Sequence, residues 1–316
     1  MNKSPPARNS HKTGVQKVTV STAEAGRRID NFIASHLKNL PKSKIYKILR
    51  RGEVRVNGSR AKQGYRLAAG DVVRLPPVQL EIDAAAAAAI PVGAIQRLLD
   101  NILYEDEGIV VLNKPAGLAV HGGSGIAYGV IDMLRAGRCD DRLELVHRLD
   151  RDTSGCLLLA KDMAVLRSLH DALRAGKVRK GYIALLKGQL QRRELNIDEP
   201  LSRQKTAAGE RKVIIDAAGK PSATHIRRCQ ELESATLADI NLLTGRTHQI
   251  RVHAADAGYP LAGDDKYGDW AFNKKLRRLG LKRLFLHAAR LELPDHQLTL
   301  EAPLPDDLNA VIERLS

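Results

Sequence analysis

Five apolar stretches, each close to glycines or charged residues, constrain the fold of this chain more than any other feature. They are GIVVLNKP (108–115), GCLLLAK (155–161), GYIALLKG (181–188), ATLADINLL (235–243) and RLFLHAARLEL (283–293). Each has the length of a strand, and helical patterns such as AVLRSLHDALRAG (164–176) are few between them. Strands in close succession predict a mixed α+β domain over residues 95–316, built on a large, mostly antiparallel mixed sheet.

A small module precedes this domain, over residues 17–78. Apolar residues at helical spacing predict a helix over 29–37, and Ser43 is suited to cap a second helix that carries one apolar stripe. The pair Asn57-Gly58 predicts the turn of a hairpin, and alternating residues over 71–75 predict another strand. We therefore expect a compact α/β module with two helices and a small hairpin.

The positive charge of the chain is concentrated in that module. The formal net charge is +15, and thirteen Lys and Arg but only three Asp and Glu lie between Gly26 and Leu75. Such a surface suits a polyanion, because neutralising phosphates releases counterions. A solvated surface or a protein–protein module is the alternative. The candidate RNA contacts are Lys42, Lys44, Lys47, Arg50, Arg51 and Arg55.

The remaining segments indicate the domain boundaries and the class of protein. Residues 1–16 are polar and basic and predict a disordered arm, while the run of alanines after Pro76-Pro77 predicts a linker over 79–94. No run reaches the ~18 apolar residues of a membrane helix, so we expect a cytoplasmic protein that contacts no membrane. The three cysteines lie too far apart for a metal knuckle and are expected to be reduced thiols.

The stretch LVHRLDRDTSG (145–155) raises the question of what Asp150 does. An acid with an arginine close by on each side stays ionised, which suits a nucleophile or a structural ion pair. His147, Asp150 and Ser154 are also the ingredients of a hydrolase triad. No G-x-S-x-G elbow is present, however, and the spacing does not place an imidazole between the acid and the serine. We therefore reject the triad.

Two further segments contain residue types that occur in cofactor or metal sites. The loop HGGSGIAYG (121–129) lacks the G-K-S/T of a phosphate loop, so it predicts a tight turn or a close approach to an RNA backbone. His248 and His253 fall on different faces of a helix or strand, so we expect structural histidines, no metal and no cofactor. Arg246, nearby, is a planar donor suited to hold a buried Asp150, in a reactive or a purely structural ion pair.

Four motifs, in order and spacing, resemble those of the RluA family of pseudouridine synthases. They are NKPAGL (113–118), VHRLDRDTSG (146–155), KGYIALLKG (180–188) and GRTHQIRVH (245–253), and the likeness covers residues 95 to 304. The segments RIDNFI, KSKIYKILRRGEVRVNG and AAGDVVRL of the basic module resemble the S4 RNA-binding domain. The resemblance implies the pseudouridine synthase fold.

The resemblance also implies an activity, the isomerisation of uridine to pseudouridine at specific sites of 23S ribosomal RNA. The base leaves N1, turns and rejoins the sugar through C5, so no redox carrier or external energy is needed. The expected partner is 23S ribosomal RNA or the assembling large subunit, and we expect a monomer. A non-catalytic RNA-binding or ribosome-assembly factor is the alternative that the charge distribution alone would allow.

The family motifs assign a role to each of five residues by resemblance. Asp150 is the nucleophile, which attacks the ribose or the base or removes a sugar proton, and Arg246 keeps it ionised. Tyr182 stacks on the uracil and helps to remove the C5 proton. Arg148, which strand geometry would place on the same face as Asp150, fills the space that the extruded base leaves. Leu286 forms an apolar wall of the base pocket, unless it packs in the core.

Overall fold

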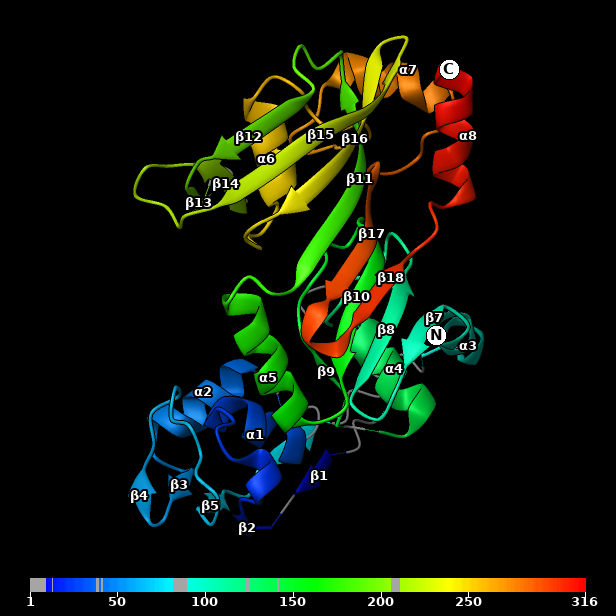
Figure 1. The fold of residues 1–316 in the computed structure, drawn as a ribbon. Coiled ribbons are helices and arrows are strands. Elements are labelled where there is room, and N and C mark those ends of the chain that lie inside the picture. The colour runs from blue at the N-terminus through cyan, green and yellow to red at the C-terminus, as the bar shows by residue number, and fades with distance from the viewer. Residues whose placement is uncertain are drawn as a thin grey trace, which may run out of the picture. The chain divides into compact units, whose positions relative to one another are not determined.

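The chain folds into two compact units, Met1–Pro91 and Val92–Ser316, which Figure 1 labels element by element. The structure, a computed structural model, describes residues 10–12, 14–37, 40, 42–81, 90–122, 126–140, 142–205 and 211–316. None of the helices in these ranges is both long and apolar enough to cross a membrane.

The N-terminal unit combines a four-stranded antiparallel sheet with two helices. The strand order is β2-β5-β3-β4. The elements are β2 (Gln16–Thr19), η1 (Thr22–Glu24), α1 (Ile29–His36), α2 (Lys42–Arg50), β3 (Arg55–Val56), β4 (Ser59–Arg60) and β5 (Val72–Leu75). Phe32 from α1, Ile45 from α2 and Val73 from β5 are buried in one core, which confirms the predicted packing of the apolar stripes.

The hairpin of this unit forms at the predicted turn, but the start of the second helix differs from the prediction. Asn57 (φ 50°) and Gly58 (φ 80°) both have left-handed backbone, as a two-residue hairpin turn requires. The Asp71 carboxylate accepts hydrogen bonds from the Asn57 side chain and the Ala68 amide, 2.8 Å each, and so ties the turn to β5. Helix α2 already begins at Lys42, so Ser43 lies inside the helix and does not cap it.

Short elements occur in the segments that were expected to be arm and linker. Strand β1 (Ser10–Lys12) pairs antiparallel with β6 (Gln79–Glu81), and α3 begins within the expected linker, at Val92. Residues 1–9, 13 and 82–89 lie outside the described residues. These two segments therefore contain some regular structure where we expected irregular chain.

The larger unit is built on a ten-stranded mixed sheet, which confirms the predicted fold class. Its main order is β12-β15-β16-β11-β17-β10-β8-β7, and β9 and β18 pair with β10 and β17. All its pairings are antiparallel except β10 with β17. The strands are β7 (Ile102–Glu105), β8 (Ile109–Lys114), β9 (Glu144–Leu145), β10 (Ser154–Ala160), β11 (Arg179–Lys187), β12 (Glu194–Asp198), β15 (Ala223–Leu232), β16 (Ala235–Leu242), β17 (Leu286–Leu293) and β18 (Leu298–Glu301).

Helices and a separate hairpin cover this sheet. Helix α5 contacts β9 and β10, and α6 contacts β15 and the hairpin β13–β14 (Figure 1). One apolar core contains Leu158 and Leu166 at the α5 end, and another contains Phe285 and Leu308 at the end near α7 and α8. These elements are α3 (Val92–Leu99), α4 (Val130–Arg138), α5 (Met163–Arg174), β13 (Leu201–Lys205), β14 (Arg211–Ile215), α6 (Gln249–Asp256), α7 (Trp270–Arg278), η2 (Pro294–His296) and α8 (Asp306–Leu315).

The glycine-rich loop before α4 is a tight turn in its described part. The Asp132 carboxylate accepts hydrogen bonds from the amides of Gly122 (3.1 Å) and Gly129 (2.8 Å), and a Cβ on Gly129 would lie 2.5 Å from the His121 backbone. The sequence prediction of a tight turn is therefore confirmed. Residues 123–125 lie outside the described residues.

Gly155 allows the one parallel contact of the sheet, directly after the loop that carries Asp150. Its φ is +105°, and a Cβ there would lie 2.2 Å from the carbonyl oxygen of Ala288. Gly155 pairs with Ala288 in the register of β10 and β17. Only a residue without a Cβ permits both this backbone conformation and this close approach.

We expect Gly155→Ala to destabilise the larger unit by more than about 3 kcal/mol. The left-handed backbone costs roughly 1–2 kcal/mol with a Cβ, and overpacking adds roughly 1–3 kcal/mol. Urea unfolding of the full chain, followed by far-ultraviolet circular dichroism, measures the change. Gly176→Ala is the matched control, because Gly176 also has positive φ (+70°) but no atom lies within 4 Å of its Cβ position. Equal losses for both variants would contradict a role for the close approach.

Candidate active site

One cavity of about 1140 Å³ in the larger unit brings together three of the four motifs, those at 146–155, 180–188 and 245–253. Its walls come from the loop 146–150, the region from the end of α5 into β11, the loop 243–248 with the start of α6, and β17. Asp150, Tyr182, Arg148, Arg246 and Leu286 all line it. The structure therefore places all five predicted site residues of this unit around one space.

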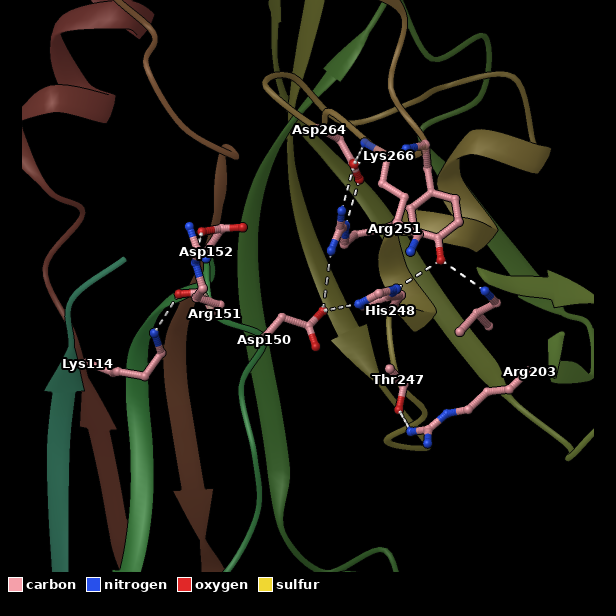
Figure 2. Close-up of polar contacts among 12 residues, drawn as sticks. Lys114, Asp150, Arg151, Asp152, Arg203, Thr247, His248, Arg251, Asp264 and Lys266 are labelled. Atoms are coloured by element: carbon pink, nitrogen blue, oxygen red, sulfur yellow. Dashed lines mark hydrogen bonds and ion pairs between the residues drawn. The ribbon is translucent and has the colours of Figure 1, made fainter. Parts of the chain in front are cut away.

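Asp150 lies in the loop between β9 and β10, facing the start of α6. Its side chain is 19% exposed, and its Oδ2 lies 3.8 Å from Nη1 of Arg251 and 3.8 Å from Nε2 of His248. Figure 2 shows all three side chains pointing toward one another. Asp150 therefore keeps access to the cavity while one cation stands beside it.

Arg251 is held in place by a second carboxylate. Its Nε and Nη2 each donate to Asp264 at 2.7 Å, and the Asp264 side chain is only 1% exposed. Burial by itself would raise the pKa of Asp264, but the hydrogen bonds and charge of Arg251 lower it below its usual value. The bidentate pair fixes the guanidinium plane, and Nη1 remains directed at Asp150.

The predicted pairing of Arg246 with Asp150 is wrong in this structure. Arg246 is exposed, and its Nε donates to the Pro221 carbonyl at 3.1 Å. It lies in the turn before α6, which buried Gln249 closes by accepting a hydrogen bond from the Arg246 amide at 2.9 Å. Since α6 begins at Gln249, Arg251 and not Arg246 comes from the helix that faces Asp150.

His248 is a site residue that sequence reasoning missed. It has left-handed backbone (φ 54°), and its Nδ1 lies 2.9 Å from the Tyr267 hydroxyl. Burial lowers the pKa of His248, so the ring is neutral at neutral pH and Arg251 is the cation next to Asp150. If Tyr267 donates to Nδ1, the ring proton is on Nε2, the atom that faces Asp150. The only available signal was its position in GRTHQIRVH.

His253 has the structural role that we predicted. It is fully buried, its Nδ1 lies 2.9 Å from the Thr224 hydroxyl and its Nε2 lies 3.0 Å from the Glu199 carbonyl. These contacts fasten α6 to β15 and the chain before β13. No cluster of three or more His, Cys, Asp and Glu suited to a metal occurs among the described residues.

Tyr182 projects from β11 into the same cavity and is 6% exposed. Burial and, second, the charge of Asp150 raise the pKa of its phenol above the usual value. The ring is therefore a neutral phenol near the Asp150 carboxylate. Stacking on a base needs only this neutral ring, whereas proton removal would first require the phenol to lose its own proton.

Arg148 reaches the cavity from a loop and not from a strand. The strand β9 ends at Leu145, so the strand alternation from which we expected Arg148 and Asp150 on one face does not apply. Both nevertheless line the cavity, and Arg148 is exposed while Leu149 between them is buried. Leu286, at the first position of β17, is 3% exposed and also lines the cavity.

Lys114 forms hydrogen bonds that stabilise the loop that carries Asp150. Its Nζ donates to the carbonyls of Pro115 and Leu118 at 2.8 Å and to that of Arg151 at 3.0 Å, and the side chain is fully buried. Burial lowers the pKa of Lys114 to about 7. The contact with Arg151, visible in Figure 2, fixes the residue that follows Asp150.

Ser154 is the serine of the rejected hydrolase triad. It is buried at the start of β10, and its hydroxyl lies 2.8 Å from Nδ1 of His287 and accepts from Arg283 at 3.1 Å. The other nitrogen of His287 lies 3.1 Å from the Ala302 carbonyl, so no carboxylate orients this ring. The hydroxyl is structural, in agreement with the rejection of a hydrolase triad.

The predicted RNA contacts of the N-terminal unit lie largely on the polar side of α2 and on β3. Lys47, Arg50, Arg51 and Arg55 are exposed, whereas Ile45, Ile48 and Leu49 are buried. Lys44 is half-buried, and the Lys42 side chain lies outside the described residues. The unit therefore presents a basic helical surface opposite its apolar core.

Comparison with known proteins gives two family matches and close relatives. Residues 108–256 match the RNA pseudouridylate synthase family, and residues 27–73 match the S4 domain. The chain is 51% identical over 299 residues to ribosomal large subunit pseudouridine synthase C of Yersinia pestis, covering 93% of each chain. It is 48% identical over 308 residues to the protein of the same name in Escherichia coli (strain K12), covering 95% of this chain and 97% of that one.

Solved structures give the same fold for the larger unit. Human RNA pseudouridylate synthase domain containing 4 is 28% identical with a TM-score of 0.60, covering 71% of this chain and 95% of that one. Human RNA pseudouridylate synthase domain containing 1 is 27% identical with a TM-score of 0.57, covering 69% and 88%. Since close relatives match along nearly the whole length, the chain belongs to the RluA family of RNA pseudouridine synthases and carries an N-terminal S4 domain.

Proposed function

We propose that this enzyme isomerises specific uridines of 23S ribosomal RNA, with Asp150 as the reactive group. The observation that carries the proposal is a carboxylate beside a fixed cation, Arg251, at the wall of a cavity that Tyr182 and Leu286 also line. The relatives from Yersinia pestis and Escherichia coli are named for the large ribosomal subunit, which supports the choice of RNA. A non-catalytic assembly factor does not fit membership of an enzyme family.

In the proposed reaction, the charged carboxylate of Asp150 acts on the nucleotide as nucleophile or as base. The N1–C1′ bond breaks, the uracil turns, and a new bond joins C5 to C1′ while the C5 proton leaves. Arg251 places a positive charge 3.8 Å from Oδ2 of Asp150, and its hydrogen bonds to Asp264 leave Asp150 free to approach the substrate. His248 adds a neutral ring on the same side.

The other cavity residues hold the extruded base and the RNA in this proposal. Tyr182 stacks on the uracil as a neutral phenol, and Leu286 forms an apolar wall. Arg148, exposed at the cavity, takes the place of the extruded base in the helix. Arg246 is assigned to the RNA backbone, since it contacts no carboxylate among the described residues.

The partner in this proposal is 23S ribosomal RNA, free or in an assembling large subunit, and the enzyme acts as a monomer. The S4 unit supplies affinity through its basic helix, because phosphate contacts dominate binding to RNA. The relatives are bacterial, and bacterial ribosomes assemble in the cytoplasm, so the proposal places the enzyme there.

We expect Asp150→Asn to reduce pseudouridine formation by at least about 10⁴-fold, because the amide is neither a nucleophile nor a base. RNA affinity should change by less than about threefold, since the side chain keeps its size. Tritium release from RNA labelled at uridine C5 measures the activity. Asp152→Asn is the control, because Asp152 is half-exposed and its carboxylate contacts Arg151 at 3.4 Å. Turnover by Asp150→Asn would exclude the assigned role.

Arg251→Gln and Arg246→Gln should separate the two arginines of the motif. Arg251→Gln leaves Asp264 buried and unpaired, so we expect a loss of roughly 3–5 kcal/mol of stability and a large fall in kcat. Arg246→Gln should raise KM severalfold at nearly unchanged stability. Thermal unfolding and steady-state kinetics of both variants test this. A larger kcat loss for Arg246→Gln would return the supporting role to Arg246.

Replacing Lys47, Arg50 and Arg55 together by Gln should flatten the salt dependence of RNA binding. Each lost phosphate contact lowers the slope of log K against log [salt] by about 0.7–0.9, so three contacts lower it by roughly two. Filter binding at several salt concentrations measures the slope. The charge-matched control replaces Lys177, Lys275 and Arg277, which contact Asp295, Glu233 and Asp265. Equal slopes for the two triple variants would exclude the basic helix as an RNA contact.

A further inference from the structure

The basic residues that line the active-site cavity fall into two groups. Four arginines have carboxylate partners: Arg174 with Asp171, Arg179 with Glu292, Arg251 with Asp264, and Arg290 with Glu292. Arg148, Lys180 and Arg246 line the same cavity and have no ion-pair partner among the residues that the structure describes. The second group is therefore free to contact an anionic ligand.

Lys180 differs from the two arginines of its group in its surroundings. Arg148 and Arg246 are exposed, so water solvates their charge, but Lys180 is partly buried. Its Nζ lies 3.3 Å from the position that a Cβ on Gly245 would take, at the turn between β16 and α6. Burial lowers the pKa of Lys180, and no carboxylate offsets this effect. Burying an ammonium group without an ion-pair or hydrogen-bond partner lowers the stability of the folded protein.

Lys180 lines the cavity from β11, beside the turn at Gly245. Lys180 and Tyr182 come from the same strand, two positions apart, and both line the cavity. A substrate whose base lies against Tyr182 therefore occupies the same cavity as Lys180.

We propose that Lys180 binds a backbone phosphate of the RNA next to the extruded uridine. This inference rests on the proposed function, because it takes RNA as the occupant of the cavity. The bases of RNA are neutral and its phosphates carry the charge, so a phosphate is the group that offsets an unpaired ammonium. Gly245 leaves room for the Lys180 Nζ beside the turn that carries Arg246. Lys180 acts as a positioning residue and touches no reacting atom.

A structural role and a phosphate-binding role of Lys180 predict different effects on stability and on substrate binding. A lysine that only supports the fold would lower the melting temperature when it is replaced. A buried lysine whose charge is neutralised only by a bound phosphate instead destabilises the free enzyme. Replacing it with an apolar side chain of similar length therefore leaves the melting temperature of the free enzyme unchanged or raises it. Binding of RNA must then weaken, because a charge-assisted hydrogen bond is lost.

The experiment compares wild type, Lys180→Met and Lys180→Arg in tritium release from C5-labelled 23S ribosomal RNA. We expect Lys180→Met to raise KM at least about tenfold, to change kcat less than about threefold, and to lower the salt slope of binding by about 0.7–0.9. Its melting temperature should be unchanged or higher. Lys180→Arg should recover most of the loss in KM, since it keeps the charge.

Lys187→Met is the matched control, because Lys187 lies on the same strand but outside the cavity and contacts Asp269 at 2.6 Å. It should leave KM and the salt slope unchanged. Tritium release by the wild-type enzyme tests the proposed function by itself. The ratio of the KM of Lys180→Met to the KM of the wild type tests the phosphate contact. A lower melting temperature of Lys180→Met with unchanged KM, or a failure of Lys180→Arg to recover KM, would overturn the proposal.

Discussion

The active site depends on one guanidinium shared unequally between two carboxylates. Arg251 makes two hydrogen bonds of 2.7 Å to Asp264, which is buried, and approaches Asp150 only to 3.8 Å. The buried pair is costly unless both partners are present, so it fixes the position of the cation. The longer contact places the positive charge of Arg251 near Asp150 without a hydrogen bond that would fix the Asp150 side chain. A reactive carboxylate needs both conditions, because it has to stay ionised and still move against a substrate.

The position of Asp150 depends on contacts at the other side of its loop. Lys114 binds the carbonyl of Arg151, and Gly155 brings the start of β10 against β17. Strand β11, which carries Tyr182, pairs with both β16 and β17 (Figure 1). The carboxylate and the cation that supports it therefore come from segments far apart in the chain, and the central strands of one sheet set the distance between them.

The cations around the cavity differ in whether the fold already pairs them with a carboxylate. Arg251 and Arg290 have acidic partners, and the structure holds them in place. Arg148, Lys180 and Arg246 have no such partner among the described residues, and of the three only Lys180 is partly buried. A site that must bind a polyanion needs cations that the fold has not already neutralised. In the proposed function these three cations contact the RNA, which is why the fold leaves them without acidic partners.

The sequence by itself determined the strands, the two units and the candidate for the reactive acid. Apolar stretches of strand length, the turn pair Asn57-Gly58 and the motif around Asp150 are local signals, because strand length, turn conformation and motif spacing depend on neighbouring residues. Only the tertiary structure decided which arginine lies beside Asp150, that His248 lies beside it too, and that Ser154 bonds to His287. It also decided that Lys180 has no ion-pair partner among the residues that the structure describes. These are contacts between segments distant in sequence. Their distances follow from the register of β10, β11 and β17 and from the start of α6 at Gln249. The composition of the chain and the spacing of its motifs specify neither the strand register nor the start of the helix.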